Sequence, residues 1–404
     1  MQYVWGLFGI ATILGIAFLL SRHKKAIKPR TVIGALVIQF IFGFIVLKWD
    51  FGKQVFQKIT AIVQSIIDTS TEGIDFVFGG MFAAEGIGFV FAFQVLTVII
   101  FFSSLISVLF YLGVMQLLTK IVGGFLAKIL QTTQPESMSA AANIFVGLTE
   151  APLVIKPYIE KMTKSELFAV MTGGAASVSG SVLVGYSLLG VPLEYLIAAA
   201  FMAAPAGLLI AKMLIPETEP VEETQVVKIE RDLESVNIVD AAAKGAIVGL
   251  ELALHIGALI LAFISLIALV NLGLGWITNI FGLESITLES ILGIIVAPLA
   301  FAVGVPWEEA VQAGSYIGQK FVLNEFVAFG SFANDIAQLS DKTVMVVSFA
   351  LCGFANLGAM GMLIGGIGGL APSRRTDLAR YGFLAIIGGT LANLLSAAIA
   401  GMLL

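Results

Sequence analysis

The chain has 404 residues, of which 58% are hydrophobic and 12% are charged, with a net charge of -5. Soluble domains carry roughly 45–50% apolar and about 25% charged residues, so this composition excludes an ordinary soluble enzyme. At roughly 20 apolar residues per membrane helix, the length admits about eight to ten crossings once loops are set aside. The composition therefore predicts an all-α polytopic membrane protein.

Residues suited to disulfide, metal or nucleophilic chemistry are scarce. Cys352 is the single cysteine, and His23 and His255 are the only histidines. Structural zinc sites and disulfide frameworks need clusters of such residues. We therefore expect no enzyme activity, no bound cofactor and no nucleic-acid partner.

The first quarter of the chain alternates apolar and basic segments. Residues Gln2–Leu20 are continuously apolar and precede a basic run over 22–30. A secretory signal has its positive charge before the apolar stretch, so we expect this helix to be retained with its N-terminus outside. Thr31–Leu47 and Phe89–Leu118 are predicted to cross the membrane. Lys53–Asp75 has apolar residues at helical spacing, which predicts an amphipathic helix in the interface or packed on the bundle.

Two later stretches interrupt the apolar pattern. Residues 131–167 surround the core Asn143–Glu150, and residues 304–335 surround the core Leu323–Phe326. Their apolar pieces of about ten residues are too short to cross, which predicts two re-entrant hairpins. Each hairpin is followed by a full-length span that small and hydroxyl residues interrupt.

The interrupted spans are Leu167–Leu189, broken over 173–180, and Val344–Gly368, broken over 353–359. Two copies of a hairpin followed by a discontinuous helix are typical of a secondary transporter whose inverted repeats meet at a midplane site. The remaining predicted spans are Val191–Ile215, Ile247–Leu274 and Tyr381–Leu403.

This pattern divides the chain into five predicted segments. They are 1–118, the N-terminal helices and interfacial helix of a scaffold; 119–215, the first transport repeat; 216–246, an acidic cytoplasmic loop that we take for a solvated connector; 247–303, a scaffold helix and connector; and 304–404, the second transport repeat.

The distribution of Lys and Arg agrees with this layout. With eight crossings and two hairpins that return to their own side, only five basic residues are left outside, namely Lys48, Lys53, Lys58, Lys320 and Lys342. Short cytoplasmic loops are enriched in Lys and Arg, so the distribution supports the re-entrant interpretation. It predicts both termini outside a bacterial cytoplasmic membrane, with the hairpins entering from opposite faces.

Glu150 and Glu325 lie at the tips of the two predicted hairpins. A charge at membrane depth costs at least about 2.5–3.5 kcal/mol, so such a residue usually faces a partner, a ligand or water. A buried ion pair or an interfacial carboxylate is the alternative. The neutral polar residues around them suit an uncharged, hydroxyl-rich substrate; they are Asn143, Thr149, Ser177, Ser179, Ser181, Asn324 and Asn356.

Asn143 and Ser177 also offer side-chain oxygens for a monovalent cation. Carbonyls freed where a helix unwinds would complete such a site. The alternative for these two residues is a hydrogen bond between helices.

Three sets of motifs, in this order along the chain, resemble the concentrative nucleoside transporter family. They are Val146-Gly-Leu-Thr-Glu-Ala-Pro152; Gly304-Val-Pro-Trp307 with Gly318-Gln-Lys320 and Asn324-Glu-Phe326; and Gly353-Phe-Ala-Asn356. The resemblance covers essentially the whole chain. It implies a homotrimer in membrane lipid, each protomer having eight transmembrane helices, two opposed hairpins and its own nucleoside path with alternating access.

The resemblance also implies roles for individual residues. Leu148 and Val182 would border the nucleobase, Thr149 and Glu150 would form the first tip, and Glu325 and Asn356 would hold the ribose hydroxyls. The coupling Na⁺ would bind Asn143, Ser177 and the carbonyls of Val146 and Val178. Proton-coupled members tend to lack the Asn, so Asn143 favours Na⁺.

Two positions depart from the family pattern. Leu148 stands where pyrimidine-selective relatives often have Gln, which favours purines or broad tolerance. Gly358-Ala359 stands where relatives usually have two serines, so one ribose contact is missing or replaced.

The leading interpretation is a Na⁺-coupled nucleoside importer. The alternatives are H⁺ coupling through Glu150 or Glu325, and a nucleoside-recognition membrane protein that does not transport.

Overall fold

The computed structural model describes residues 2–79, 90–221, 235–280, 282 and 286–404. Within these ranges the chain forms helices and no strand, which confirms the predicted all-α class. Parts of the predicted layout lie outside the described residues, among them Phe89 and residues 222–234 of the acidic loop.

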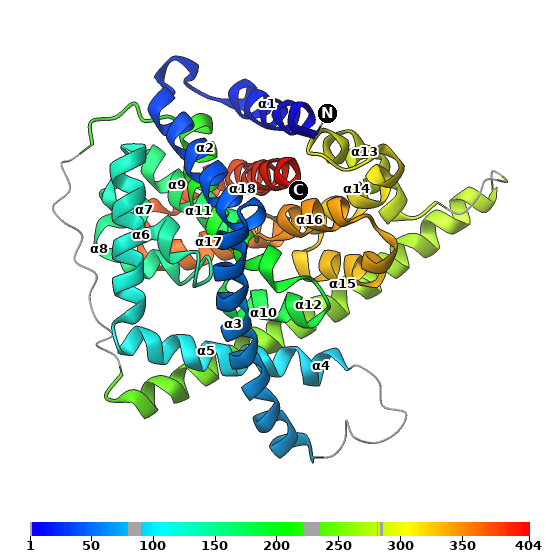
Figure 1. Ribbon diagram of the computed structural model, residues 1–404, viewed down its shortest axis with the longest axis horizontal. Helices are drawn as coiled ribbons and strands as arrows, with labels where there is room; N and C mark the ends of the chain where they lie inside the picture. The colour runs from blue at the N-terminus through cyan, green and yellow to red at the C-terminus, as the bar shows by residue number, and fades with distance from the viewer. Residues whose placement is uncertain (1, 80–89, 222–234, 281, 283–285) are drawn as a thin grey trace.

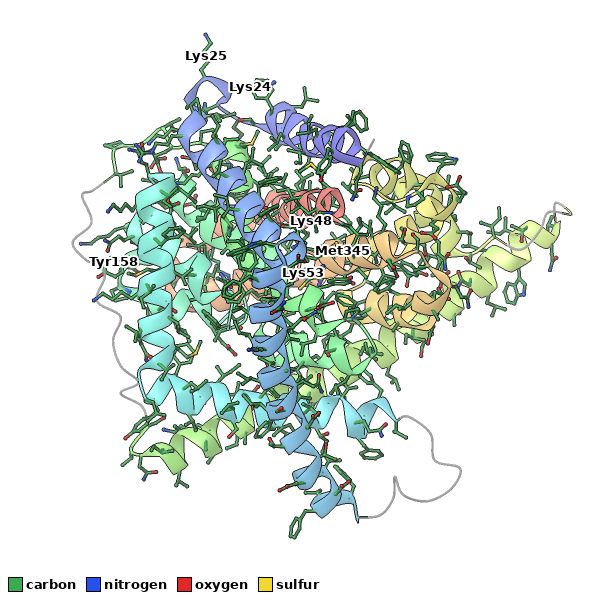
Figure 2. The ribbon with its side chains drawn as sticks, viewed as in Figure 1. Lys24, Lys25, Lys48, Lys53, Tyr158 and Met345 are labelled. Carbon is green, nitrogen blue, oxygen red and sulfur yellow. The ribbon has the colours of Figure 1, made fainter. Side chains whose placement is uncertain are left out.

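The first two predicted spans form α1 (Gln2–Leu20) and α2 (Pro29–Gly43), which a short turn at η1 (Lys24–Ala26) connects. Pro29 occupies the first turn of α2, where its missing amide hydrogen costs nothing. The chain then passes through a π-helical turn, η2 (Phe44–Lys48), into α3 (Asp50–Phe78). Figure 2 shows Lys24 and Lys25 at one end of α2, and Lys48 and Lys53 at the other.

The predicted amphipathic segment is the helix α3, which extends past the packed helices (Figure 1). Its predicted apolar residues Val55, Ile59 and Ile62 are 43%, 47% and 62% exposed. A helix packed on the bundle would bury them. Their exposure therefore favours the alternative of a helix in the membrane interface.

The third predicted span is shorter than expected. It consists of α4 (Phe91–Gln94) and α5 (Leu96–Tyr111), and Val114–Leu118 already belong to α6 (Val114–Leu130). The predicted end at Leu118 is therefore wrong. Gly113 adopts the left-handed conformation, with φ of 81°, and turns the chain between the two helices.

The longest helix, α12 (Ile238–Ile280), has 43 residues and packs along α5. It begins inside the predicted loop segment 216–246, whose last residues are therefore helical. A Cβ atom at Gly245 would lie 2.5 Å from Ser107 Cβ, and one at Gly249 would lie 2.7 Å from Ile100 Cα. Small residues thus allow the two backbones to approach closely.

The centre of the fold consists of α9 (Lys164–Ala176), α10 (Gly180–Leu188), α11 (Leu193–Leu214) and α18 (Arg375–Leu403). In the most apolar window of the span from α9 to α10, 94% of the residues are buried, against 17% for α12. The fourth, fifth and last predicted spans therefore form an inner core, and α1, α2, α5 and α12 lie around it.

The first predicted hairpin is made of α7 (Gln134–Ala142), η4 (Ala151–Ile155) and α8 (Lys156–Ile159). Thr133 and Glu136 form a capping box that begins α7. Residues 143–150 connect α7 to η4 without forming a helix. The predicted tip, Asn143–Glu150, is thus the irregular segment of this hairpin.

The second predicted hairpin is made of α14 (Trp307–Val322) and α15 (Glu325–Asp335), with the break at residues 323–324. Ser331 Oγ donates to Gln319 Oε1 at 2.9 Å, and the Tyr316 hydroxyl donates to Asp335 at 2.5 Å. These two bonds pair residues progressively farther from the break, so the two arms run antiparallel.

The span predicted over Val344–Gly368 is broken as expected, into α16 (Asp341–Leu351) and α17 (Leu357–Leu370). Because of this break it is not among the seven helices of the described chain that are long and apolar enough to cross on their own. The predicted connector before the second hairpin contains a helix, α13 (Leu288–Ala302), which meets α14 at 117°. Two 3₁₀ turns complete the fold, η5 (Ile336–Gln338) and η6 (Pro372–Arg374).

We predict that Gly249→Ala destabilises the protein, because the added Cβ would push α12 away from the α5 backbone. Overpacking of this kind costs about 1–3 kcal/mol. Gly273→Ala in the same helix is the matched control, because no described heavy atom lies within 4 Å of its added Cβ. Thermal unfolding of the purified variants checks this, and equal melting temperatures would contradict the packing.

Candidate substrate and cation site

A carboxylate and an amide meet where the second hairpin contacts the last broken helix. Glu325 is the first residue of α15, and Asn356 caps the N-terminus of α17. Asn356 Nδ2 donates to Glu325 Oε2 at 2.8 Å, while Asn356 Oδ1 accepts from the Ala359 amide at 2.8 Å. Both side chains are buried. The structure thus brings together the two residues predicted to hold ribose hydroxyls.

Two helix N-termini surround this pair. Asn324 caps α15 by accepting from the Val327 amide at 2.9 Å. Helix N-termini carry partial positive charge, which stabilises a carboxylate there. The N-terminus of α15 therefore favours negative charge on the Glu325 side chain. A carboxylate beside an amide can accept and donate hydrogen bonds to neighbouring hydroxyl groups of one ligand.

Tyr186 is a site residue that the sequence interpretation missed. Its ring stacks on Phe329 at 4.2 Å and meets the edge of Phe326 at 4.7 Å. Its hydroxyl is buried and interacts with the Glu325 carboxylate. Tyr186 therefore lies beside the pair predicted to hold ribose hydroxyls, and its own hydroxyl adds a third polar group to that place. The sequence offered one sign of this role, because Tyr186 belongs to α10, the helix that resumes after the first break.

The first hairpin tip lies between α9 and α17. A Cβ atom at Gly174 of α9 would lie 3.1 Å from Leu148 Cβ, and one at Gly366 of α17 would lie 2.9 Å from Thr149 Cγ2. Leu148 is buried, whereas Thr149 is exposed. The tip therefore contacts the broken span of each repeat.

Glu150 and Val182 are placed more loosely. Glu150 is partly exposed, and its Oε2 accepts from the Gly147 amide at 3.4 Å. Val182 is fully buried in the first turn of α10, where its amide donates to the Ser179 cap at 3.4 Å. Neither makes a hydrogen bond to Glu325 or Asn356 in the described contacts, so the structure does not join the two predicted carboxylates.

Asn143 has an oxygen atom free to bind a cation. It ends α7, is buried, and its Nδ2 donates to the Ser139 carbonyl at 3.0 Å. Its Oδ1 is buried without a hydrogen-bond partner among the described residues. A buried acceptor in this state costs about 1–3 kcal/mol unless something binds it. The donor chemistry of Asn143 therefore fits a hard monovalent cation.

The hairpin tip that carries Asn143 is attached to the first break. The Gly180 amide donates to the Phe145 carbonyl at 2.9 Å. Ser177 ends α9 in an extended conformation, and its hydroxyl donates to the Gly174 carbonyl at 3.3 Å. The carbonyls of Val146 and Val178 lie outside helices, and no described donor bonds to them. The structure thus leaves both predicted backbone ligands available.

The two broken spans cross each other at their breaks. The Phe354 amide donates to the Ser177 carbonyl at 3.0 Å. We call the two unwound segments, 177–179 and 352–356, the crossing. The acceptor of this bond, Ser177, is one of the residues predicted to bind the cation. Asn356 lies two residues after the donor, Phe354.

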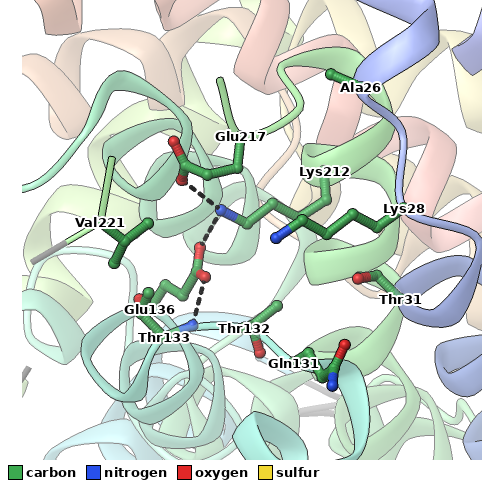
Figure 3. Close-up of a pocket in the computed structure, with 10 residues that line it drawn as sticks. All are labelled: Ala26, Lys28, Thr31, Gln131, Thr132, Thr133, Glu136, Lys212, Glu217 and Val221. Atoms are coloured by element: carbon green, nitrogen blue, oxygen red, sulfur yellow. Dashed lines mark hydrogen bonds and ion pairs between the residues drawn. The ribbon is translucent and has the colours of Figure 1, made fainter. Parts of the chain in front are cut away.

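A second polar cluster lies at the base of the first hairpin (Figure 3). Lys212 Nζ is 2.7 Å from Glu136 Oε2 and 3.4 Å from Glu217 Oε2, and Glu136 also accepts from the Thr133 amide at 2.8 Å. Lys212 belongs to α11 and Glu136 to α7. The cluster therefore anchors the base of the hairpin to the inner core, away from the tip residues.

The fold and the site together define the class of protein. Apolar spans, two short-helix hairpins and two crossing broken helices around buried polar groups are the architecture of a secondary transporter.

Comparison with known families identifies the family. The model "Na+ dependent nucleoside transporter C-terminus" matches residues 195–401, "Na+ dependent nucleoside transporter N-terminus" matches 8–81, and "Nucleoside recognition" matches 92–192. The chain belongs to the concentrative, Na⁺-dependent nucleoside transporter family. It is a multi-pass membrane transporter and not an enzyme.

Relatives match over nearly the whole chain. This chain is 55% identical to the uncharacterized transporter YutK of Bacillus subtilis, and the match covers 100% of both chains. It is 47% identical to the nucleoside permease NupC of Helicobacter pylori, and that match covers 99% of this chain and 97% of the relative. It is 36% identical to the human solute carrier family 28 member 3, covering 98% of this chain and 59% of the relative.

Solved structures of a relative represent two sides of a transport cycle. CNTnw in an inward-facing substrate-bound state matches with a TM-score of 0.94 and 51% identity, covering 100% of this chain and 99% of that one. A CNTnw variant in an outward-facing state matches with a TM-score of 0.96 and 52% identity, at the same coverage. The fold therefore supports alternating access.

We predict that Glu325→Gln severely impairs nucleoside uptake while the protein stays folded. The neutral amide loses a charge-assisted acceptor for ligand hydroxyls, an interaction of about 1.5–3 kcal/mol. Uptake of labelled nucleoside, with thermal unfolding as the control for folding, checks this. Normal uptake by the variant would remove Glu325 from the site.

Proposed function

We propose that the chain is a secondary active importer that couples nucleoside entry to inward Na⁺ flow across a bacterial cytoplasmic membrane. One observation carries this proposal, the bond from the Phe354 amide to the Ser177 carbonyl. It joins the break beside the unpartnered Asn143 oxygen to the break that ends at Asn356, whose side chain bonds Glu325. A cation site and a hydroxyl-binding pair are thus attached to the same crossing.

The nucleoside occupies the space between the two hairpin tips. Leu148 and Val182 border the base, Thr149 and Glu150 form one wall, and Glu325 and Asn356 bind the ribose hydroxyls. The buried, apolar Leu148 supports contact with a base face, and the bonded Glu325–Asn356 pair supports recognition of hydroxyls. Because Gly358-Ala359 lacks hydroxyl side chains, the ribose depends all the more on this pair.

The coupling Na⁺ binds Asn143, Ser177 and the carbonyls of Val146 and Val178. Occupation of this site would fix the first hairpin tip against the first break and so favour nucleoside binding, and linkage requires the reverse effect as well. One Na⁺ moving inward at about 100 mV supplies about 2.3 kcal/mol, which suffices for roughly fifty-fold accumulation of a neutral solute.

The segments have separate tasks in this mechanism. Residues 1–118 and 247–303 form a scaffold, 119–215 and 304–404 form the moving transport repeats, and 216–246 connects them on the cytoplasmic side. The burial of α9 to α11 and α18 inside a less buried periphery supports this division. The exposed apolar faces of α3 and α12 support a homotrimer in lipid. The distribution of Lys and Arg supports both termini of each protomer outside.

Proteoliposomes separate the possible driving forces. Labelled nucleoside should accumulate under an inward Na⁺ gradient and be indifferent to a protonophore. Uptake that ignores Na⁺ but collapses with the proton gradient would assign coupling to the carboxylates. Nucleoside binding without any uptake would indicate a recognition protein.

We predict that Asn143→Ala weakens Na⁺ dependence more than it weakens nucleoside recognition at saturating Na⁺. The variant loses the unpartnered oxygen while the substrate pair remains. The measurement is the Na⁺ concentration for half-maximal uptake alongside the nucleoside KM. An unchanged Na⁺ requirement would rule out Asn143 as a ligand.

We predict that Leu148→Gln shifts competition toward uridine and cytidine relative to adenosine and guanosine. Leucine leaves the polar edge of a pyrimidine unbonded, whereas glutamine offers a donor and an acceptor worth about 1–3 kcal/mol in a dry site. Unlabelled nucleosides competing against one labelled substrate provide the test. An unchanged rank order would mean that Leu148 does not face the base.

A further inference from the structure

Lys320 is a buried cation that the transport mechanism above does not use. It lies in the last turn of α14 and is 1% exposed. Its ammonium donates to the Ala350 carbonyl at 2.8 Å and to Asn393 Oδ1 at 2.7 Å. No carboxylate of the described chain forms an ion pair with it within 4.0 Å. Burying an unpaired ammonium is costly, so its retention calls for a compensating interaction.

Besides the more distant charge of Glu325, the ends of two helices compensate for the buried ammonium. Asn393 of α18 accepts from Lys320 and donates through Nδ2 to the Ala176 carbonyl at 2.6 Å and the Cys352 carbonyl at 3.0 Å. Ala176 is the last residue of α9, and Cys352 directly follows α16. Helix C-termini carry partial negative charge, roughly half an electron charge each. The Lys320 ammonium therefore lies where two such termini converge.

The backbone at Gly353 passes very close to Asn393. A Cβ atom at Gly353 would lie 2.2 Å from Asn393 Oδ1 and 2.7 Å from the Ala176 carbonyl oxygen. A glycine is needed there for the backbone to pass Asn393. The Lys320–Asn393 contacts are thus built into the crossing rather than added at its surface.

The second hairpin and the break between α16 and α17 carry Glu325 and Asn356 a few residues further along the chain. Lys320 lies five residues before Glu325, and Cys352 lies four residues before Asn356. Lys320 and Asn393 join the end of α14 to the start of the break at Cys352. The Glu325–Asn356 bond of 2.8 Å joins the start of α15 to the end of that break. A shift of α14 relative to the crossing would therefore separate Glu325 from Asn356.

We propose that Lys320 is a positioning residue of the transport site. Through its ammonium and the Asn393 amide, it ties the second hairpin to the C-termini of both broken helices and so sets the distance between Glu325 and Asn356. Lys320 does not contact the nucleoside. The inference rests on the nucleoside site proposed at Glu325 and Asn356, and it is independent of which ion drives transport.

Kinetic analysis of charge-removing and charge-keeping variants tests the proposal. Lys320→Met should raise the nucleoside KM about ten- to a hundred-fold, because the hydrogen bonds of a charged group are lost. Lys320→Arg keeps the charge and should recover part of the affinity. Lys58→Met, at an exposed position of α3, is the control and should have wild-type KM. A purely structural role would lower Vmax through the amount of folded protein and leave KM unchanged.

Asn393→Asp covers the case in which Lys320→Met does not fold. It gives the ammonium a carboxylate partner but removes the donor to Ala176 and Cys352, so KM should again rise. A wild-type KM in either folded variant would overturn the positioning role. Absence of nucleoside uptake by the wild-type protein would instead overturn the proposed function, so the two failures are distinguishable.

Discussion

The unwound backbone of two membrane helices must find hydrogen-bond partners inside the protein, and the centre of this fold is organised around that requirement. Lipid offers no partners, so each freed amide and carbonyl is costly unless protein or a bound ligand satisfies it. The Phe354 amide bonds the Ser177 carbonyl, Asn393 bonds the carbonyls of Ala176 and Cys352, and Ser179 and Asn356 cap the helices that resume. Where protein partners are lacking, as at the carbonyls of Val146 and Val178, a cation can serve.

The crossing also separates charge. Helices end at Ala176 and Leu351 with partial negative charge, and new helices begin after Ser179 and Asn356 with partial positive charge. Lys320 lies at the negative ends, and Glu325 lies at a positive end. The buried lysine and the buried glutamate are thus complementary parts of one electrostatic arrangement. Each side chain stabilises the helix ends that it contacts, which explains how both can remain inside an apolar core.

Most of the architecture could be predicted because it depends on local signals. Apolar length identified the spans, and short apolar pieces around Glu150 and Glu325 identified the hairpins. Small and hydroxyl residues located both breaks. The predicted end at Leu118 was wrong, because an unbroken apolar run continues past the turn that Gly113 makes.

Long-range contacts could not be predicted in the same way. Asn393 lies in a long, mostly apolar helix, and nothing in the local sequence indicates that its partner is Ala176, 217 residues away. Tyr186 likewise gives no periodic signal, and its role depends on Phe326, Phe329 and Glu325 from the other repeat. The motifs indicated which residues matter, whereas only the fold shows which of them meet.

The most direct measurement is the simultaneous flux of labelled Na⁺ and labelled nucleoside into proteoliposomes containing the purified protein. If the crossing joins a cation site to the nucleoside site, nucleoside added outside should accelerate Na⁺ entry, and the two fluxes should keep a fixed ratio as either gradient is varied. Nucleoside entry that draws no Na⁺ with it would contradict the account.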